Sequence, residues 1–313
     1  MLIVCGEALL DVFAAGDTPT GMALEARAGG SPFNLAVGLA RLGQPVAFFS
    51  AVSTGFMGER LMRTLHEEGV NTSAVLRTDA PTTLSVVGLD AAGVPSYAFY
   101  GERGADRQLP LAALASVPSG PVGISAINVG SYATVVEPIA STLRALVERE
   151  RGQALIAYDP NIRLNVEPDL QRWRDQLAWM LPRTHLLKIS DEDLGLLQPG
   201  TALEAFARNA LAHGVKALVV TRGAEGAVAW TAQAQASTPP VPVTVIDTVG
   251  AGDTFQAALL TWLAEHGALS PDALGALTAA QLQDALAFAA RAAAITCSRR
   301  GADMPRRAEL QAP

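Results

Sequence analysis

The sequence is poor in cysteine, histidine and charge. Only 2 of its 313 residues are cysteine, and charged residues make up 17%. Cys5 and Cys297 each stand in an apolar stretch, which favours reduced core cysteines in a cytoplasmic protein over a structural disulfide. The 4 histidines are scattered without the spacing of metal ligands, so a zinc site is not expected.

Concentrated positive charge is also missing. The formal net charge is −7, and no run of Lys or Arg occurs. Nucleic acids and anionic membranes are bound mainly through such charge, so neither is an expected partner. A nucleotide ligand stays open, because Mg²⁺ and backbone amides can offset phosphate charge locally.

Long hydrophobic runs are absent as well. The longest, such as residues 255–264, stop at about ten residues, too few to span a bilayer. The first residues, MLIVCGEALLD, carry no basic segment and meet Gly6, Glu7 and Asp11 early, which indicates a first strand and not a signal peptide. A soluble, cytoplasmic protein is expected.

Apolar residues are abundant, at 50% of the chain, which is ample for a large core. Short runs rich in branched residues alternate with amphipathic helical stretches such as 33–42, 58–68 and 137–151. This alternation predicts a mostly parallel sheet covered by helices on both faces, with ligands bound beyond the carboxyl ends of the strands. The expected strands are 2–5, 46–50, 124–129, 154–158, 186–189 and 217–221.

Two segments break this alternation. Residues 12–28 contain Gly, Thr and Pro with few core positions, and residues 82–100 alternate as a half-buried hairpin with a turn at 91–93. We interpret them as a small β lid over the open end of the main sheet. An ordinary extra edge hairpin is the alternative.

The most informative segment is 246–255, IDTVGAGDTF. Small residues leading into an apolar helix present unpaired backbone N–H groups and the positive end of the helix dipole, which together bind phosphate without a cationic side chain. Asp253 makes sense there if its carboxylate takes the proton of an acceptor hydroxyl; the alternative is a plain helix N-cap. Phe255 stands where a dinucleotide fingerprint would need Gly, and the Lys of a Walker loop is absent.

A second motif lies at 28–36, AGGSPFNLA, with a Gly pair, a Ser cap and Pro at the first helical position. Asn34 falls in the first turn, close to the backbone that the glycines leave open, where it could bind a polyol. By itself the motif is equally consistent with a well-capped helix.

Together the two motifs resemble the paired signatures of the PfkB (ribokinase-like) carbohydrate kinases. The similarity extends over nearly the whole chain, from the Gly6-Glu7…Asp11 opening to the 221–226 turn and Gly301-Ala302. It implies a ribokinase-like three-layer α/β domain over residues 1–313, with a mostly parallel sheet and a β-sheet lid from segments of about 12–28 and 82–105. In this family the lid often carries dimer contacts, so a homodimer is an open expectation.

The resemblance also implies an ATP-dependent sugar kinase acting on a primary hydroxyl, with Asp253 as base. The expected anion hole is Gly250, Ala251 and Gly252. The expected sugar contacts are Asp11, Gly29, Gly30, Asn34, Tyr97, Phe99 and Arg163. A surface ion pair is an equal alternative for Arg163.

By the same resemblance, ATP, Mg²⁺ and K⁺ are the expected cofactors. The expected nucleotide contacts are Lys188, Ser190, Thr221, Gly223, Gly226 and Ala290, although a solvent-exposed strand-end lysine is an equal alternative for Lys188. Asp247, Val249 and Gly301 would form a monovalent-cation site. Asp193 would orient Mg²⁺ through water, although Ser190 and Asp193 replace the Asn and Glu usual in the family.

The opening Gly6-Glu7-Ala8-Leu9-Leu10-Asp11 and the segments 159–163 and 188–192 are most similar to the fructokinase branch, so fructose is the favoured substrate. Gly101, where relatives often have Arg after the lid's Phe-Tyr, leaves 2-keto-3-deoxygluconate, another sugar acid and ribose as alternatives. A non-catalytic sugar or nucleotide sensor of the same fold is a different class, which the retained Asp253 argues against. A nucleotide-cofactor dehydrogenase is disfavoured because no G-x-G-x-x-G follows the first strand.

Overall fold

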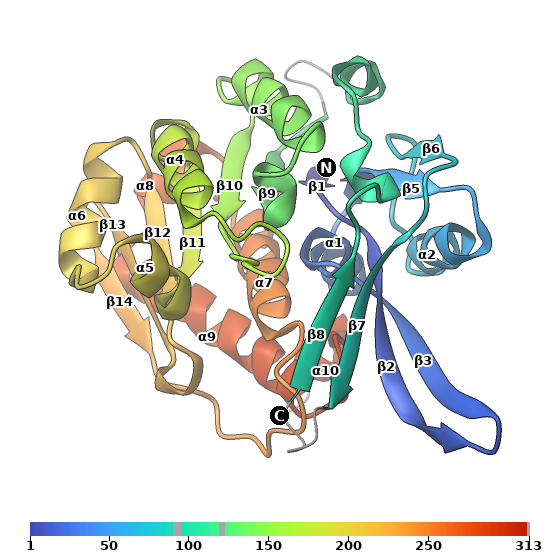
Figure 1. Cartoon of the computed structure of the whole chain (residues 1–313). Helices are drawn as coiled ribbons and strands as arrows, with labels where there is room; N and C mark the ends of the chain where they lie inside the picture. The colour runs from blue at the N-terminus through green and yellow to red at the C-terminus, as the bar shows by residue number, and fades with distance from the viewer. Residues whose placement is uncertain (90–94, 119–122, 312–313) are drawn as a thin grey trace.

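The computed structural model describes residues 1–89, 95–118 and 123–311. Within them, eight strands form a central sheet in the order β14-β13-β12-β11-β10-β9-β1-β4 (Figure 1). The strands from β4 to β12 in this order run parallel, and β13 and β14 are antiparallel at one edge. The expected mostly parallel sheet is confirmed. Its strands are β1 (Leu2–Cys5), β4 (Val46–Phe49), β9 (Ala126–Gly130), β10 (Leu155–Asp159), β11 (Leu186–Ser190), β12 (Ala217–Thr221), β13 (Ala227–Thr231) and β14 (Gln235–Thr238).

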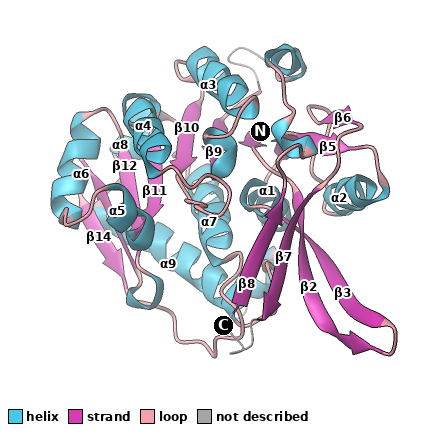
Figure 2. Ribbon diagram, viewed as in Figure 1, coloured by secondary structure: helices cyan, strands magenta, loops and turns pink. Residues whose placement is uncertain are grey.

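Helices cover both faces of this sheet (Figures 1 and 2). One face is covered by α3 (Ile139–Glu150), α4 (Leu170–Met180), α5 (Asp191–Leu197) and α6 (Leu203–Ala212). The other is covered by α1 (Ser31–Arg41), α2 (Phe56–Glu67), α7 (Ala251–Glu265), α8 (Pro271–Gly275) and α9 (Ala279–Cys297). Outside these layers are α10 (Arg307–Gln311) and a two-stranded sheet of β5 (Ala51–Ser53) and β6 (Leu76–Thr78).

The core follows from the two-residue period of the strands. In β1, Leu2 and Val4 belong to the apolar cluster on the α1/α7 side, whereas Ile3 and Cys5 belong to the cluster on the α3/α4 side. A strand buried on both faces needs apolar residues at every position, which is why these strands appear as continuous hydrophobic runs.

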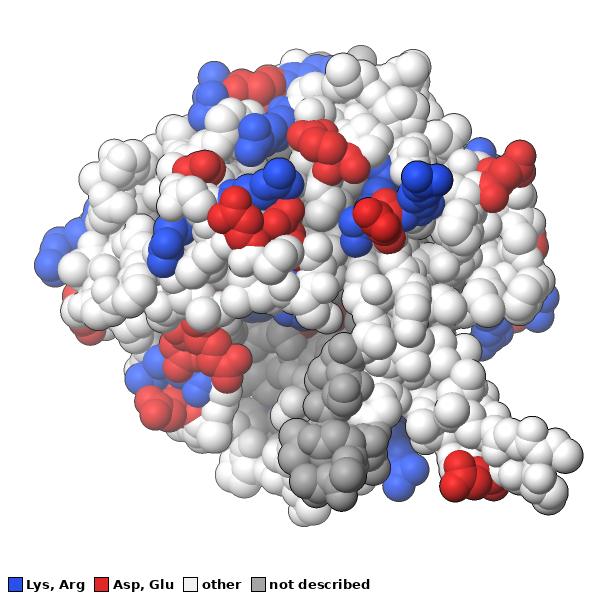
Figure 3. Space-filling model, in the orientation of Figure 1, with Lys and Arg blue, Asp and Glu red and all other residues white. Residues whose placement is uncertain are grey.

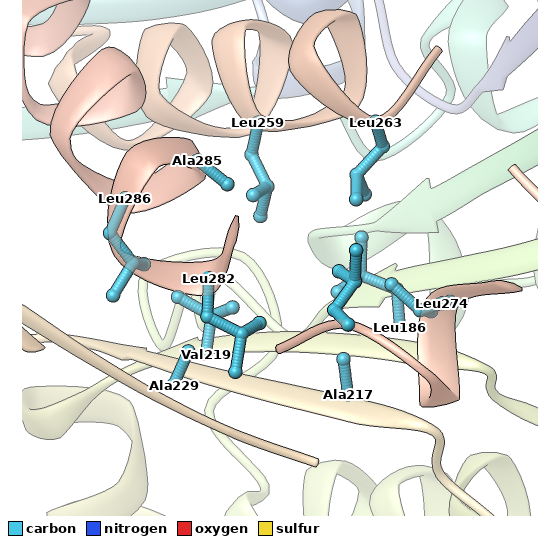
Figure 4. A pocket seen from close by; sticks show the side chains of 11 residues that line it. Leu186, Ala217, Val219, Ala229, Leu259, Leu263, Leu274, Leu282, Ala285 and Leu286 are labelled. Atoms are coloured by element: carbon cyan, nitrogen blue, oxygen red, sulfur yellow. The ribbon is translucent and has the colours of Figure 1, made fainter. Parts of the chain in front are cut away.

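An apolar void lies inside the first of these clusters, between strands β11, β12 and β13 and helices α7, α8 and α9 (Figure 4). Leu259 and Leu263 point into it from α7, and Leu282 and Leu286 from α9. Its volume is about 10 Å³ and it has no polar lining, so it is a packing defect of the core and not a ligand site.

A separate four-stranded sheet, here called the lid, projects from the main body in the order β3-β2-β7-β8 (Figures 1 and 2). Its strands are β2 (Leu9–Thr18), β3 (Gly21–Gly29), β7 (Thr83–Leu89) and β8 (Pro95–Tyr100). The lid expectation is confirmed, and the edge-hairpin alternative is wrong, because none of these strands joins the central sheet. The expected turn at 91–93 falls outside the described residues.

Charges of both signs are interspersed on the face seen in Figure 3. Among the described helices, none is both long enough and apolar enough to cross a membrane.

Candidate active site

A cavity of about 510 Å³ opens where the carboxyl ends of the parallel strands meet the lid. Its walls come from segments far apart in the chain: the end of β1, the lid, the start of α1, the loop after β10 and the start of α7. The lining residues are Glu7, Leu9, Asp11, Gly30, Ser31, Asn34, Ser85, Phe99, Tyr132, Asn161, Arg163, Asn165, Val166, Thr248, Val249, Gly250, Gly252 and Asp253.

Asp253 lies in the first turn of α7 and lines this cavity, with 9% of its surface exposed. Its Oδ1 accepts a hydrogen bond from the Ser31 hydroxyl at 2.6 Å, and its Oδ2 accepts one from Asn34 Nδ2 at 2.9 Å. The two sequence motifs therefore meet at one carboxylate. Each carboxylate oxygen has a second lone pair, which leaves Asp253 able to accept a further hydroxyl.

The expectation for Ser31 was wrong. It is the first helical residue of α1 and not its cap; the N-cap is Gly30, at φ 100°, and no side chain caps this helix. The Ser31 hydroxyl is thus free to donate to Asp253 instead, a contact across 222 residues of sequence.

The loop before α7 is shaped by Gly250, the N-cap, at φ 78°. A Cβ at this position would lie 2.6 Å from the Cβ of Ala302, so a side chain is excluded by backbone angle and by space. The amide of Ala251 donates to the Thr248 carbonyl at 3.2 Å and is engaged within the loop. Of the expected anion-hole residues, Gly250 and Gly252 line the cavity and Ala251 does not.

On the lid side, Asp11 in β2 points into the cavity beside Ser85 of β7, its neighbour in the strand ladder. Burial raises the pKa of the Asp11 carboxyl, and a hydrogen bond from Ser85 opposes this. Gly29 lies opposite Leu9 in the ladder, and the Asp11 carboxylate occupies the space where a Gly29 side chain would stand.

Two other expected sugar contacts lie in the same cavity. The ring of Phe99 packs edge-on against Tyr132 at a centroid distance of 5.5 Å. Arg163 follows β10, and its Nη1 donates to the Ile162 carbonyl at 2.9 Å. No carboxylate of the described residues forms an ion pair with Arg163, so the surface ion pair alternative is not what the structure has. Tyr97 lies in β8, but its side chain falls outside the described part.

A buried acidic group forms the floor of the cavity. Glu7 is 1% exposed, and burial raises its pKa to about 8; the nearby carboxylate of Asp106 adds to the shift. Asp106 accepts hydrogen bonds from Thr83 of the lid and from Tyr132 OH, at 2.9 Å for the latter. Asp106 therefore joins the lid to the main body.

Lys188 is neither exposed nor directed into open space, so the solvent alternative is wrong. Its ammonium donates to Asp159 Oδ2 at 2.7 Å, and both side chains are buried. Ser190 caps α5, where its hydroxyl accepts the Asp193 N–H at 3.0 Å. Burial and the nearby Asp159 raise the pKa of Asp193 to about 6.

The remaining expected nucleotide contacts lie outside the lining of the cavity. Thr221 ends β12 directly beside Ser190 in the ladder, so both are at the carboxyl edge of the sheet. Gly223 (φ 49°) and Gly226 (φ 84°) form the turn into β13, and Ala290 is half-buried in α9.

The three residues of the expected cation site are brought together. Asp247 accepts the Val249 N–H on Oδ1 at 3.0 Å and the Gly301 N–H on Oδ2 at 2.8 Å. Within the described ranges, no cluster of three or more His, Cys, Asp or Glu side chains has the geometry to bind a metal. Any cation bound here would therefore need backbone carbonyl oxygens as ligands in addition to Asp247, and carbonyl oxygens are ligands that K⁺ can bind.

Sequence reasoning assigned no site role to Ser85, Tyr132 and Asn161, which line the cavity, or to Asp159, and it gave Ser31 only the role of a helix cap. Asp159 ends β10 and Asn161 follows it, both in the segment 159–163 named above, and polar residues at the carboxyl end of a strand were the available signal. The positive φ of Asn161 (43°) and Ser131 (54°) at the same sheet edge has no counterpart in sequence patterns.

The fold and the two helix N-termini that converge on Asp253 are those of a ribokinase-like carbohydrate kinase. The family described as pfkB family carbohydrate kinase matches residues 1–308, and the chain belongs to this family.

Relatives and solved structures agree with this membership. The chain is 37% identical to a fructokinase of Rhizobium leguminosarum bv. trifolii over 84% of this chain and 79% of the relative. It is 34% identical to a fructokinase of Klebsiella pneumoniae over 93% of this chain and 94% of the relative. It is similar to the fructokinase structure with bound ATP from Xylella fastidiosa (TM-score 0.85, 27% identity, 99% and 96% covered). It is also similar to the Vibrio cholerae fructokinase structure with fructose, ADP and calcium (TM-score 0.82, 28% identity, 99% and 97% covered).

Proposed function

We propose that this protein is an ATP-dependent fructokinase that phosphorylates a primary hydroxyl of the sugar. The observation that carries the proposal is the position of Asp253, a carboxylate in a cavity large enough for a sugar, held by Ser31 and Asn34 at the start of α7. Relatives named fructokinase and a neighbour with fructose and ADP bound support fructose as the acceptor.

In this proposal the sugar lies between the lid and the Asp253 carboxylate. Asp11 accepts hydrogen bonds from its hydroxyls, Gly29 and Gly30 leave room for it, and Asn34 fixes one edge. Phe99 covers its apolar face, Tyr97 stays an expected sugar contact, and Arg163 reaches a distal oxygen. Asp253 takes the proton of the reacting hydroxyl as the phosphoryl group arrives.

ATP would bind along the carboxyl edge of β11 and β12, with Thr221, Gly223, Gly226 and Ala290 around the nucleoside and Ser190 nearer the phosphates. The amides of Gly250 and Gly252 and the dipole of α7 would offset charge on the transferred group. The engaged amide of Ala251 would take part only if the loop opens its bond to Thr248.

Metal ions complete the proposal. The buried Asp159 Oδ1 has no hydrogen-bond partner among the described residues, and it lies near Asp193. Such an orphaned acceptor beside a second carboxylate fits Mg²⁺-bound water, with Asp193 as the orienting group. Mg²⁺ would supply charge neutralisation at the phosphates. Asp247, Val249 and Gly301 would hold K⁺ beside the anion-binding loop.

A homodimer through the outer face of the lid is also proposed. Leu24 and Tyr100 on this face are 56% and 64% exposed, and contact with a second copy of the chain would bury this apolar area. Wild-type protein should run as a dimer in light scattering after gel filtration, and Leu24→Glu as a monomer. A monomeric wild type would contradict this.

We also propose that the enzyme acts in the cytoplasm. Cys5 and Cys297 are both free thiols, which suits a reducing compartment. Fractionation of the producing cells tests this, and recovery of the enzyme outside the cytoplasmic fraction would contradict it.

The decisive experiment is ATP consumption against fructose, ribose, 2-keto-3-deoxygluconate and other sugar acids, with and without Mg²⁺ and K⁺. The proposal expects the highest kcat/KM with fructose, loss of turnover without Mg²⁺ and stimulation by K⁺. A higher kcat/KM for another sugar would replace fructose as the substrate. Sugar binding without turnover would identify a sensor and refute the kinase.

A further inference from the structure

The ion pair of Lys188 and Asp159 is buried in the middle of the carboxyl edge of the sheet. The lysine is 4% exposed and the aspartate 5%, and the Nζ to Oδ2 distance is 2.7 Å. The free energy needed to remove two charges from water is about as large as the attraction gained between them. Proteins in which apolar residues of the same volume replace such a pair are often at least as stable. Fold stability is therefore a weak reason for the pair.

The surroundings of the ammonium point to a different role. A Cβ at Gly252 would lie 3.3 Å from Lys188 Nζ, and apart from the chain neighbours and the backbone of its own helix no other described atom would be within 4 Å of it. Gly252 is the second residue of α7, directly before Asp253, and it lines the cavity. The missing side chain at Gly252 thus leaves the ammonium facing the first turn of the helix where phosphate is proposed to bind.

The ammonium also has hydrogen-bonding capacity to spare. Of its three N–H donors, one is used within the described residues, on Asp159. The other charged groups near the pair are Asp193 of α5, Arg163 of the loop after β10 and Asp253 of α7. Lys188 is the cation of this group that lies against Gly252.

The choice of lysine is informative in this chain. The sequence has 23 Lys and Arg residues, and only Lys188 and Lys216 are lysines. A lysine carries a compact charge on a flexible stem, which suits a narrow space beneath a glycine, whereas the planar guanidinium of arginine needs more room.

Resting on the proposed kinase function, we propose that Asp159 holds the Lys188 ammonium behind the first turn of α7, where it stabilises the phosphoryl group during transfer. In that step the bond from the γ-phosphorus to the ADP oxygen breaks and a bond to the sugar oxygen forms. The hydroxyl proton passes to Asp253, and Lys188 keeps its own protons. Lys188 acts on the reacting group, and Asp159 is a positioning residue that acts through it.

The test compares Lys188→Met, Lys188→Arg, Asp159→Asn and the double variant Asp159→Asn/Lys188→Met, with Lys216→Met as the matched control. Lys216 precedes β12 at the opposite end of the sheet. Lys188→Met should lower kcat about a hundredfold, the loss typical of one transition-state donor, with little change in the KM for fructose. Lys188→Arg keeps the charge and should lose less, and Lys216→Met should match wild type.

The double variant separates the two roles. Removing both partners leaves no unpaired buried charge, so its Tm should recover relative to either single variant, while kcat stays low. If the double variant regains both Tm and kcat, the lysine is only the structural partner of Asp159 and the inference is wrong. Calorimetric binding of fructose shows that each variant is folded. Absence of turnover in wild type would instead refute the kinase proposal.

Discussion

Glu7→Gln should change the pH dependence of stability in a way that follows from the burial of this side chain. Burial raises the pKa of Glu7 from an ordinary value of 4.5 to about 8. The folded protein therefore holds a proton that the unfolded chain releases above about pH 4.5, so Glu7 costs stability as the pH rises from 4.5 towards 8. Glutamine cannot ionise and carries no such cost.

The magnitude follows from the linkage relation. One pKa unit corresponds to about 1.4 kcal/mol, so the cost accumulated between pH 5 and 7.5 is about 3 kcal/mol. For a chain of 313 residues this is a shift of about 5 °C in Tm. Variant minus wild-type Tm should thus rise by about 5 °C between pH 5 and 7.5.

Thermal unfolding by circular dichroism across this pH range measures the effect. Glu67→Gln, on the exposed side of α2, is the control and should follow the wild-type trend. A Glu7→Gln difference that stays constant with pH would mean that Glu7 is ionised in the folded protein, and the reasoning from burial would fail.

Other predictions address the loop, the core and the lid. Gly250→Ala should lower kcat about a hundredfold, because its Cβ would meet Ala302 and shift the loop by a large fraction of an ångström. Unchanged steady-state kinetics would show that the loop can accommodate a side chain at this position. Leu260→Ala removes a side chain that is fully buried in α7 and should cost about 3 kcal/mol in urea unfolding, whereas a loss below about 1 kcal/mol would indicate a core that collapses freely. Asp106→Ala leaves the Tyr132 hydroxyl without an acceptor and removes the hydrogen bond that holds Thr83 of β7. Tm should fall by the equivalent of about 1–3 kcal/mol, and the KM for fructose should rise because the lid is held less firmly. A wild-type KM in this variant would show that Asp106 does not position the lid.

Much of the fold could be predicted because the strands are buried on both faces. The runs at β1, β4 and β12 are continuous and apolar, and they were expected within a residue or two of their bounds. The antiparallel edge strands β13 and β14 were missed, since short Ala-rich segments after a Gly turn carry no clear period. The long helix α9 was also missed, although Thr278 and Gln281 form a capping box at its start.

The candidate site was predictable where a local motif carries the chemistry, as at Asp253 and Asn34. It was not predictable where the chemistry depends on strand register or on contacts between distant segments. The pairing of Lys188 with Asp159 requires β10 and β11 to be neighbours in a particular register, and the Ser31 contact requires two helix starts to face each other. Neither arrangement is encoded by residue spacing within one segment.

The central claim is that the Asp253 carboxylate takes the proton of the sugar hydroxyl. Its most direct test is the rate of fructose phosphorylation by purified Asp253→Asn, with ATP binding measured by calorimetry on the same sample. The account predicts that kcat falls by about 10²–10⁴ while ATP binding and Tm stay close to wild type. Near-normal turnover in a folded Asp253→Asn protein would contradict it.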